Sequence, residues 1–228
     1  MARPLVALFD IDGTLIDAGG AGRRAIEAAM EDVVGPDHGL GEVRFGGMTD
    51  PAIVLEGLRA TGKPADHAIV ARVLDAYLQR LPDELRRAPP RILPGVGDVL
   101  DWLATLADVA IGLGTGNLQA GAEAKLTPVD LWRRFDFGGF GSDHADRATL
   151  IGIGADRGAA RLGRDRAECR VVVIGDTPRD IAAAQAIGAR SLGVGTAWHP
   201  AAELRAAGAT WAVDDLTAPA VRQALLLD

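Results

Sequence analysis

The stretch from Leu5 to Thr14, which reads L-V-A-L-F-D-I-D-G-T, constrains the fold more than any other part of the chain. Residues 5–9 form an apolar run long enough for a buried parallel strand, and the turn residues 12–14 end it abruptly. Two carboxylates, Asp10 and Asp12, therefore stand at the C-terminal end of this strand. Open α/β sheets carry their chemistry at that edge, so we expect a functional site there.

The part of the chain that follows predicts helices, and the strand pattern does not resume for a long way. Helical spacing recurs in three segments, at residues 19–34, 49–62 and 69–81. The proline-rich segment 88–94 follows them. We therefore expect a small helical unit, residues 17–92, inserted after the first strand.

From Gly95 onward, helical and strand-like segments alternate. Short apolar strands are expected at residues 109–113, 170–174, 191–194 and 211–213, and a helix over residues 149–162 is expected before the second of them. Such an alternation predicts a parallel sheet covered by helices. The predicted fold class is therefore α/β, with a Rossmann-like three-layer core domain formed by residues 1–16 and 93–228 and a small α-helical cap domain formed by residues 17–92.

The composition narrows both the class of protein and the class of ligand. An apolar content of 48% with 24% charged residues is globular, and the net charge of −7 argues against nucleic-acid binding. No apolar segment approaches the roughly 20 residues that cross a bilayer, so no membrane partner is expected. The single cysteine, Cys169, cannot form an intramolecular disulfide, which fits a reducing cytosol. The first predicted strand leaves no room for a signal peptide, so we expect a soluble cytoplasmic protein.

Small polar or acidic residues follow two further predicted strands. Residues 115–117 read T-G-N after one strand, Asp176 follows another, and Asp180 lies at the start of the next helix. Because the C-terminal ends of parallel strands meet at one edge of the sheet, these residues would share a cleft with Asp10 and Asp12. In so acidic a chain, an anionic ligand there would need a divalent cation or a helix N-terminus to hold it.

The motifs D-I-D-G-T, G-L-G-T-G-N and G-D-T-P-R-D together resemble the haloacid dehalogenase superfamily, specifically its phosphatases with a helical cap inserted after the first strand. The resemblance covers nearly the whole chain and is greatest to the phosphoglycolate phosphatase branch. It implies Mg²⁺-dependent hydrolysis of a small phosphomonoester metabolite through an aspartyl-phosphate intermediate.

The resemblance also assigns roles to the acidic residues. Asp10 would be the nucleophile, and Asp12 would act as general acid towards the leaving alcohol and then as general base for water. Asp176 would hold Mg²⁺ together with Asp10 and the backbone carbonyl of Asp12. Asp180 would not bind the metal directly but would hold in position the water that is bound to it.

The phosphoryl group would be held by the turn after the second core strand. Thr115 would donate its hydroxyl to a phosphoryl oxygen, with the backbone N–H groups near Gly116 and Asn117 assisting. Gly13 would permit the tight turn after Asp12. For the positive side chain of the site we favour Lys125, because a compact ammonium can contact both Asp10 and phosphate.

Two parts of the site stay open at this point. Arg147 is the alternative to Lys125, since many relatives place a Lys-Pro where this chain has Asp146-Arg147-Ala148. The segment G-G-M-T-D, residues 46–50, looks like a substrate-facing cap loop that often reads G-R-T-D in relatives, so Met48 replaces an arginine. Met48, Thr49 and Arg23 of the first cap helix are the candidate specificity residues, and the lost cation weighs against a carboxylated substrate such as phosphoglycolate.

Several alternatives share these motifs. A sugar-phosphate mutase similar to β-phosphoglucomutase would return the phosphoryl group to a sugar instead of admitting water. A dehalogenase is disfavoured, because such relatives resemble D-x-Y at the first motif and need neither Asp12 nor a metal. A non-catalytic binding protein with this fold is disfavoured by the complete set of acids. The expected partner is a small phosphorylated metabolite, and the sequence leaves the choice between monomer and dimer open.

Overall fold

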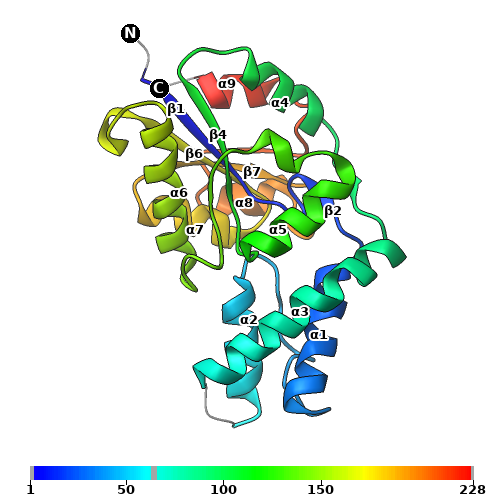
Figure 1. The fold of residues 1–228 in the computed structure, drawn as a ribbon. Helices are drawn as coiled ribbons and strands as arrows, with labels where there is room; N and C mark the ends of the chain where they lie inside the picture. Colours follow the sequence, from blue (N-terminus) through cyan, green and yellow to red (C-terminus); the bar gives the residue numbers. More distant parts are fainter. Residues whose placement is uncertain (1–2, 63–65, 227–228) are drawn as a thin grey trace.

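Strand β1, Leu5–Phe9, lies in the middle of a six-stranded parallel sheet with the order β5-β4-β1-β6-β7-β8 (Figure 1). The computed structural model describes residues 3–62 and 66–226 of the chain. The neighbours of β1 are β4 (Val109–Gly114) and β6 (Arg170–Gly175), which pair with it along its whole length. The remaining strands are β5 (Gly138–Gly139), β7 (Arg190–Val194) and β8 (Trp211–Val213). The predicted parallel sheet is confirmed.

Helices cover both faces of this sheet, which explains why every residue of β1 is apolar and buried. Val6 and Leu8 pack in one cluster with residues of α6 (Arg147–Arg161) and α7 (Pro178–Ala186). The alternate residues of β1 pack in a second cluster with α4 (Val96–Ala104) and α9 (Ala220–Leu226). Two further core helices are α5 (Gln119–Leu126) and α8 (Ala201–Ala206). The strand therefore carries its C-terminal residues into the interior of a three-layer core.

The start of α6 differs from the sequence prediction. A helix was expected over residues 149–162, whereas α6 begins at Arg147. The side chain of Asp146 accepts a hydrogen bond from the Thr149 N–H at 2.9 Å and so caps the helix. As a result Arg147 lies in the first turn of a helix and not in a loop.

In the described residues of the inserted unit, the structure has three helices: α1 (Ala21–Val34), α2 (Asp50–Ala60) and α3 (His67–Arg87). The predicted apolar face of α1 is buried against α3, which continues through Pro82 beyond its predicted end. The chain enters and leaves this unit through a two-stranded antiparallel ribbon, β2 (Ile16–Asp17) and β3 (Arg91–Ile92). The expected domain boundary after residue 16 lies within this ribbon, and the expected boundary after residue 92 lies at its end.

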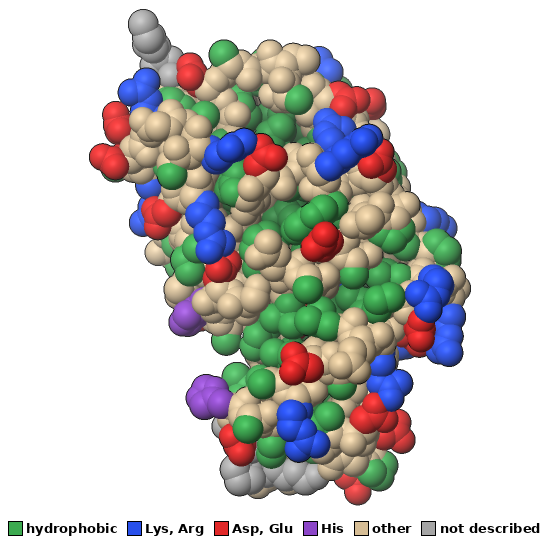
Figure 2. Space-filling model, viewed as in Figure 1, with side chains coloured by type: hydrophobic (Ala, Val, Ile, Leu, Met, Phe, Trp, Pro, Cys, Tyr) green, Lys and Arg blue, Asp and Glu red, His purple; other side chains and the backbone are tan. Residues whose placement is uncertain are grey.

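The surface of the described residues is mixed in charge. On the face drawn in Figure 2, Lys and Arg side chains lie among Asp and Glu side chains over both the sheet domain and the helical unit. Among the described helices, none is long and apolar enough to pass through a membrane.

Candidate active site

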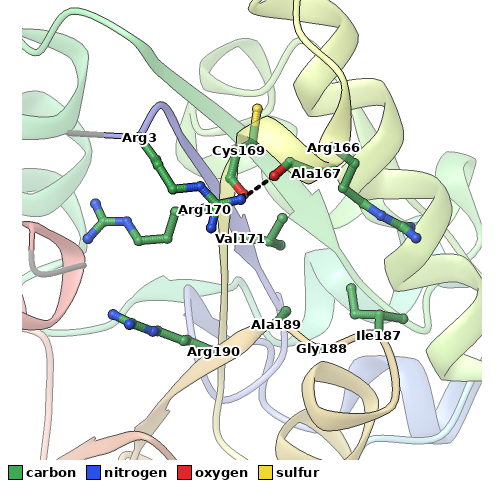
Figure 3. A pocket seen from close by; sticks show the side chains of 10 residues that line it. All are labelled: Arg3, Arg166, Ala167, Cys169, Arg170, Val171, Ile187, Gly188, Ala189 and Arg190. Atoms are coloured by element: carbon green, nitrogen blue, oxygen red, sulfur yellow. Dashed lines mark hydrogen bonds between the residues drawn. The ribbon is translucent and has the colours of Figure 1, made fainter. Parts of the chain in front are cut away.

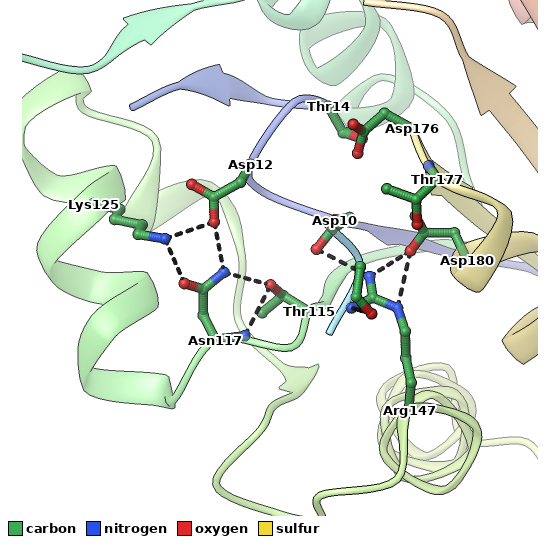
Figure 4. Close-up of polar contacts among 11 residues, drawn as sticks. Asp10, Asp12, Thr14, Thr115, Asn117, Lys125, Arg147, Asp176, Thr177 and Asp180 are labelled. Carbon is green, nitrogen blue, oxygen red and sulfur yellow. Dashed lines mark hydrogen bonds and ion pairs between the residues drawn. The ribbon is translucent and has the colours of Figure 1, made fainter. Parts of the chain in front are cut away.

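The turn after β1 brings Asp10 and Asp12 to the C-terminal edge of the sheet, as predicted (Figure 4). The Asp10 N–H donates to the Ile174 carbonyl of β6 at 2.9 Å, so the ladder between β1 and β6 holds the first residue of the turn. Gly13 has a φ of +83°, and a Cβ there would collide with the carboxylate of Asp176. Glycine is therefore required at this position both by the turn and by the neighbouring acid.

Three buried carboxylates meet beside this turn. Asp10, Asp176 and Asp180 each place an oxygen within 4.8 Å of the other two, and none of the three residues is more than 5% exposed. Burial raises the pKa of Asp10 to about 6, with the Arg147 guanidinium opposing the shift. Burial together with the negative charges of Asp180 and Asp10 raises the pKa of Asp176 to about 8.

Arg147 is the cation of this cluster. Its Nη2 lies 3.2 Å from Asp10 Oδ1, its Nε donates to Asp180 Oδ1 at 3.0 Å, and the side chain is 9% exposed. The other oxygen of Asp180 accepts hydrogen bonds from the Thr177 N–H at 3.0 Å and from the Thr177 hydroxyl at 2.7 Å. Both oxygens of Asp180 are thus engaged, which suits a residue that supports the site from behind Asp10 and Asp176.

A second polar group lies on the other side of the turn. Lys125 Nζ donates to Asp12 Oδ2 and to Asn117 Oδ1, each at 2.6 Å. The Asn117 side-chain amide donates to Asp12 at 3.0 Å and to the Thr115 hydroxyl at 2.8 Å. The contact of Lys125 in the structure is therefore with Asp12, and the predicted contact with Asp10 is made by Arg147. The two candidate cations thus pair with different acids, Lys125 with Asp12 and Arg147 with Asp10.

The acidic cluster fits a divalent cation. Asp10, Asp176 and Asp180 bring three carboxylates against one guanidinium in a buried space, so the ionised cluster carries an excess of two negative charges. Buried charge of this kind requires compensation. Carboxylate oxygens are the ligands that Mg²⁺ prefers, and two of these side chains with a backbone carbonyl would leave room for water in its coordination.

The cap loop of residues 46–50 lies against the core. The Asp50 N–H donates to the Gly116 carbonyl at 2.8 Å, and the Thr49 hydroxyl donates to the Ala145 carbonyl at 2.8 Å. Arg147 donates to the Gly47 carbonyl at 3.3 Å. A Cβ on Gly116 would collide with the Met48 carbonyl, so the backbone of the loop rests on the turn between β4 and α5.

The predicted specificity residues differ in what the structure leaves available to a ligand. Met48 is half-buried beside Gly116, whereas Thr49 is buried and its hydroxyl both donates to Ala145 and accepts from Ala52. The Arg23 guanidinium donates to Glu27 and to the Val43 carbonyl and stacks over the ring of Phe45. Arg23 is thus held within the cap.

Sequence reasoning missed Asp50 as part of the site. Its buried carboxylate accepts the Leu118 N–H at 2.8 Å and a hydrogen bond from Tyr77. The segment T-D-P reads as an ordinary helix start, where an acid in the first turn is common, so the sequence carries no local signal for these distant contacts.

A separate cavity of about 320 Å³ lies at the opposite edge of the sheet, where β6 and β7 begin (Figure 3). Four arginines are among the residues that line it: Arg3, Arg166, Arg170 and Arg190. Arg3 donates to the Cys169 carbonyl at 2.9 Å, and Arg170 donates to the Leu225 carbonyl at 2.5 Å. These side chains tie chain segments together, and the cavity takes no part in the acidic site.

The fold and the acidic edge belong to a known class of enzyme. Residues 5–188 match the family model described as haloacid dehalogenase-like hydrolase, and the chain belongs to this family of hydrolases.

Individual relatives agree with this family. The chain is 29% identical over 218 residues to "Probable phosphatase IndB" of Dickeya dadantii, covering 90% of this chain and 86% of that protein. The fold is similar to the crystal structure of CbbY from Rhodobacter sphaeroides in complex with phosphate, with a TM-score of 0.71, 19% identity and 100% coverage of both chains. It is also similar to a predicted phosphoglycolate phosphatase from Haemophilus somnus, with a TM-score of 0.65, 17% identity and coverage of 94% and 95%.

Proposed function

We propose that the protein hydrolyses a small phosphomonoester metabolite with the help of Mg²⁺, through an aspartyl-phosphate formed on Asp10. The observation that carries the proposal is the division of the site into two halves around the turn after β1. One half is the buried cluster of Asp10, Asp176 and Arg147, and the other is the pair of Asp12 and Lys125. Phosphoryl transfer needs alignment and charge neutralisation more than covalent chemistry, and the two halves supply both.

In the first half-reaction an Asp10 oxygen attacks phosphorus, and the bond from phosphorus to the leaving oxygen breaks. The Asp12 carboxyl, whose side chain is 44% exposed, gives a proton to that oxygen. In the second half-reaction a water attacks phosphorus, Asp12 takes its proton, and the bond to Asp10 breaks to release inorganic phosphate. Arg147 orients the Asp10 carboxylate throughout by its contact at 3.2 Å.

The phosphoryl oxygens would be bound by the turn between β4 and α5. Thr115 and Asn117 are buried and already linked by a hydrogen bond of 2.8 Å, so their positions are set before a ligand arrives. Lys125 approaches the same turn through Asn117. Such preorganised donors stabilise the charge that develops on the phosphoryl group.

Asp10, Asp176 and the Asp12 carbonyl would hold Mg²⁺, with Asp180 supporting them. When bound, the ion would neutralise the excess negative charge of the cluster and align the phosphoryl group with Asp10. Burial, together with the negative charges of Asp180 and Asp10, raises the pKa of Asp176, and a bound cation would favour the ionised carboxylate.

The proposal is tested by assaying p-nitrophenyl phosphate with Mg²⁺ and with EDTA, beside the variant Asp10→Asn. We expect release of p-nitrophenol only by the wild-type enzyme with metal. Metal-independent release, or full activity of Asp10→Asn, would overturn the proposal. Assaying a hexose phosphate for both inorganic phosphate and an isomeric sugar phosphate separates hydrolysis from a mutase reaction.

The arginines of α1 and the apolar side chain of Met48 support a substrate whose leaving group is uncharged. Arg23 is held by Glu27 and Val43, and Arg24 donates to Glu84 and to the Gly19 carbonyl, so both arginines of α1 are engaged within the cap and its connection. Met48 offers no charge. A carboxylate next to the phosphate, as in phosphoglycolate, would therefore lie beside Asp12 without one of these cations as a partner.

A further inference from the structure

Helix α5, which carries Lys125, begins at a residue that cannot cap it. Leu118 occupies the N-cap position and has no polar side chain. Its N–H donates instead to Asp50 Oδ2 at 2.8 Å, and the next N–H, of Gln119, donates to the Ser142 hydroxyl at 3.1 Å. Asp50 belongs to α2, so the helical cap supplies an acceptor that the sequence of α5 lacks.

The same residue binds the other side of the phosphate-binding turn. The Asp50 N–H donates to the Gly116 carbonyl at 2.8 Å, while its carboxylate accepts the Leu118 N–H. Gly116 and Leu118 flank Asn117, whose side chain bonds Asp12. One cap residue therefore fixes both ends of the short segment from which Asn117 projects.

Asp50 also acts on the ammonium of Lys125. Burial raises the pKa of Asp50 to about 6, and the Lys125 charge and the Leu118 N–H oppose this shift, so the carboxyl is ionised at neutral pH. The negative charge of Asp12 also acts on this carboxyl and raises its pKa. The Lys125 ammonium is thus attracted by an acid of the cap as well as by Asp12, with which it forms a hydrogen bond.

Tyr77 of α3 completes this arrangement. Its buried hydroxyl bonds the Asp50 carboxylate. A Cβ placed on Gly22 of α1 would lie 3.1 Å from Lys125 Nζ and 4.0 Å from the Tyr77 hydroxyl oxygen, so the two polar groups meet at the same point of the cap. Each of the three cap helices therefore contributes one residue around Lys125.

We propose that Asp50 is a positioning residue for the phosphatase reaction. It holds the start of α5 by its hydrogen bonds, and its charge attracts the Lys125 ammonium, which in turn holds Asp12 in place to protonate the leaving oxygen. Asp50 does not touch the reacting atoms. The inference rests on the proposed function. It predicts that a variant of Asp50 loses more activity with a substrate whose leaving group needs a proton than with one whose leaving group does not.

The test compares two substrates of the Mg²⁺-loaded full-length enzyme, 2-hydroxyethyl phosphate and p-nitrophenyl phosphate. The alkoxide of the first is a poor leaving group that needs the general acid, whereas p-nitrophenolate leaves without a proton. For Asp50→Asn we expect kcat/KM to fall about 30-fold with the alkyl substrate and less than about threefold with the aryl substrate. The matched control is Asp66→Asn, which alters the exposed acid that caps α3 and should change neither value.

Each outcome decides the matter. Equal losses with both substrates, or no loss with either, would refute the positioning role while leaving the phosphatase activity intact. A wild-type enzyme that hydrolyses neither substrate would refute the proposed function itself. If Asp50→Asn fails to fold, Tyr77→Phe removes one hydrogen bond from the same carboxylate and keeps the ring, and it must show the same preference for aryl over alkyl phosphate.

Discussion

Lys125 donates to Asp12 at 2.6 Å, and the two residues are 113 positions apart in the sequence. The pair joins a helix of the core to the turn after the central strand, and the Lys125 side chain is only 5% exposed. A buried charge is little screened by water, so it interacts strongly with its partner and with any phosphoryl group bound next to it.

Lys125→Ala should therefore lower kcat with 2-hydroxyethyl phosphate by about 10²-fold, because Asp12 loses its partner and the phosphoryl group loses a cation. Steady-state kinetics measure the loss, and thermal unfolding checks that the variant is folded. Full turnover in Lys125→Ala together with loss in Arg147→Ala would transfer the role proposed for Lys125 to Arg147.

Arg147→Ala should destabilise the metal-free protein. The guanidinium is buried between Asp10 and Asp180, and removing one partner of a buried ion pair leaves uncompensated charge. Such losses amount to about 3–5 kcal/mol, and added Mg²⁺ should recover part of the stability by taking over the compensation. Urea unfolding with Mg²⁺ and with EDTA measures both effects. An unchanged midpoint in EDTA would show that the carboxylates do not depend on Arg147.

The stability of the metal-free protein should fall as the pH rises. The pKa of Asp176 is about 8 in the folded protein, above its value of 3.8 in the unfolded chain, so the folded state binds more protons between these values. Its contribution to stability is fully present below about pH 4 and is lost as the pH rises through about 8. Thermal unfolding in EDTA should show this slope, and Asp176→Asn should flatten it. Added Mg²⁺ should stabilise the protein more at the alkaline end, because it requires ionised carboxylates.

Substrate charge should matter more than substrate size. We expect kcat/KM for 2-hydroxyethyl phosphate to exceed that for phosphoglycolate by about tenfold or more, since the two differ in one carboxylate. Met48→Arg should narrow the gap by supplying a cation in the cap loop, and Met48→Leu is the apolar control. Higher activity with phosphoglycolate in the wild-type enzyme would contradict the preference for an uncharged leaving group.

The sequence predicts the core of the site well, because its determinants are local. An apolar run followed by turn residues marks β1 and β6 as buried parallel strands, and this alone places Asp10 and Asp176 at the same edge. By contrast, β5 consists of Gly138 and Gly139 at the edge of the sheet, where two glycines give no strand signal.

The partners of the charged side chains are not predictable in this way. Lys125 was expected against Asp10, and the structure places it against Asp12, because the choice depends on how α5 is oriented. That orientation is set in part by Asp50, which lies 68 positions before Leu118, the residue at the start of α5 with which it forms a hydrogen bond. Similarly, Arg147 reaches Asp10 because Asp146 starts α6 two residues before the predicted helix.

The ribbon of β2 and β3 has an evolutionary consequence. Asp17 and Arg91 are 74 positions apart, yet they pair at 2.6 Å, so the chain departs from and rejoins the sheet domain at one place. A segment with adjacent ends can be exchanged for a homologous one at little entropic cost, and new substrates can be acquired by recombination at this point. After such an exchange, α5 would keep its hydrogen-bond acceptor only if the new cap carries an acid at the position of Asp50. Caps that can be exchanged at this point must therefore share that acid.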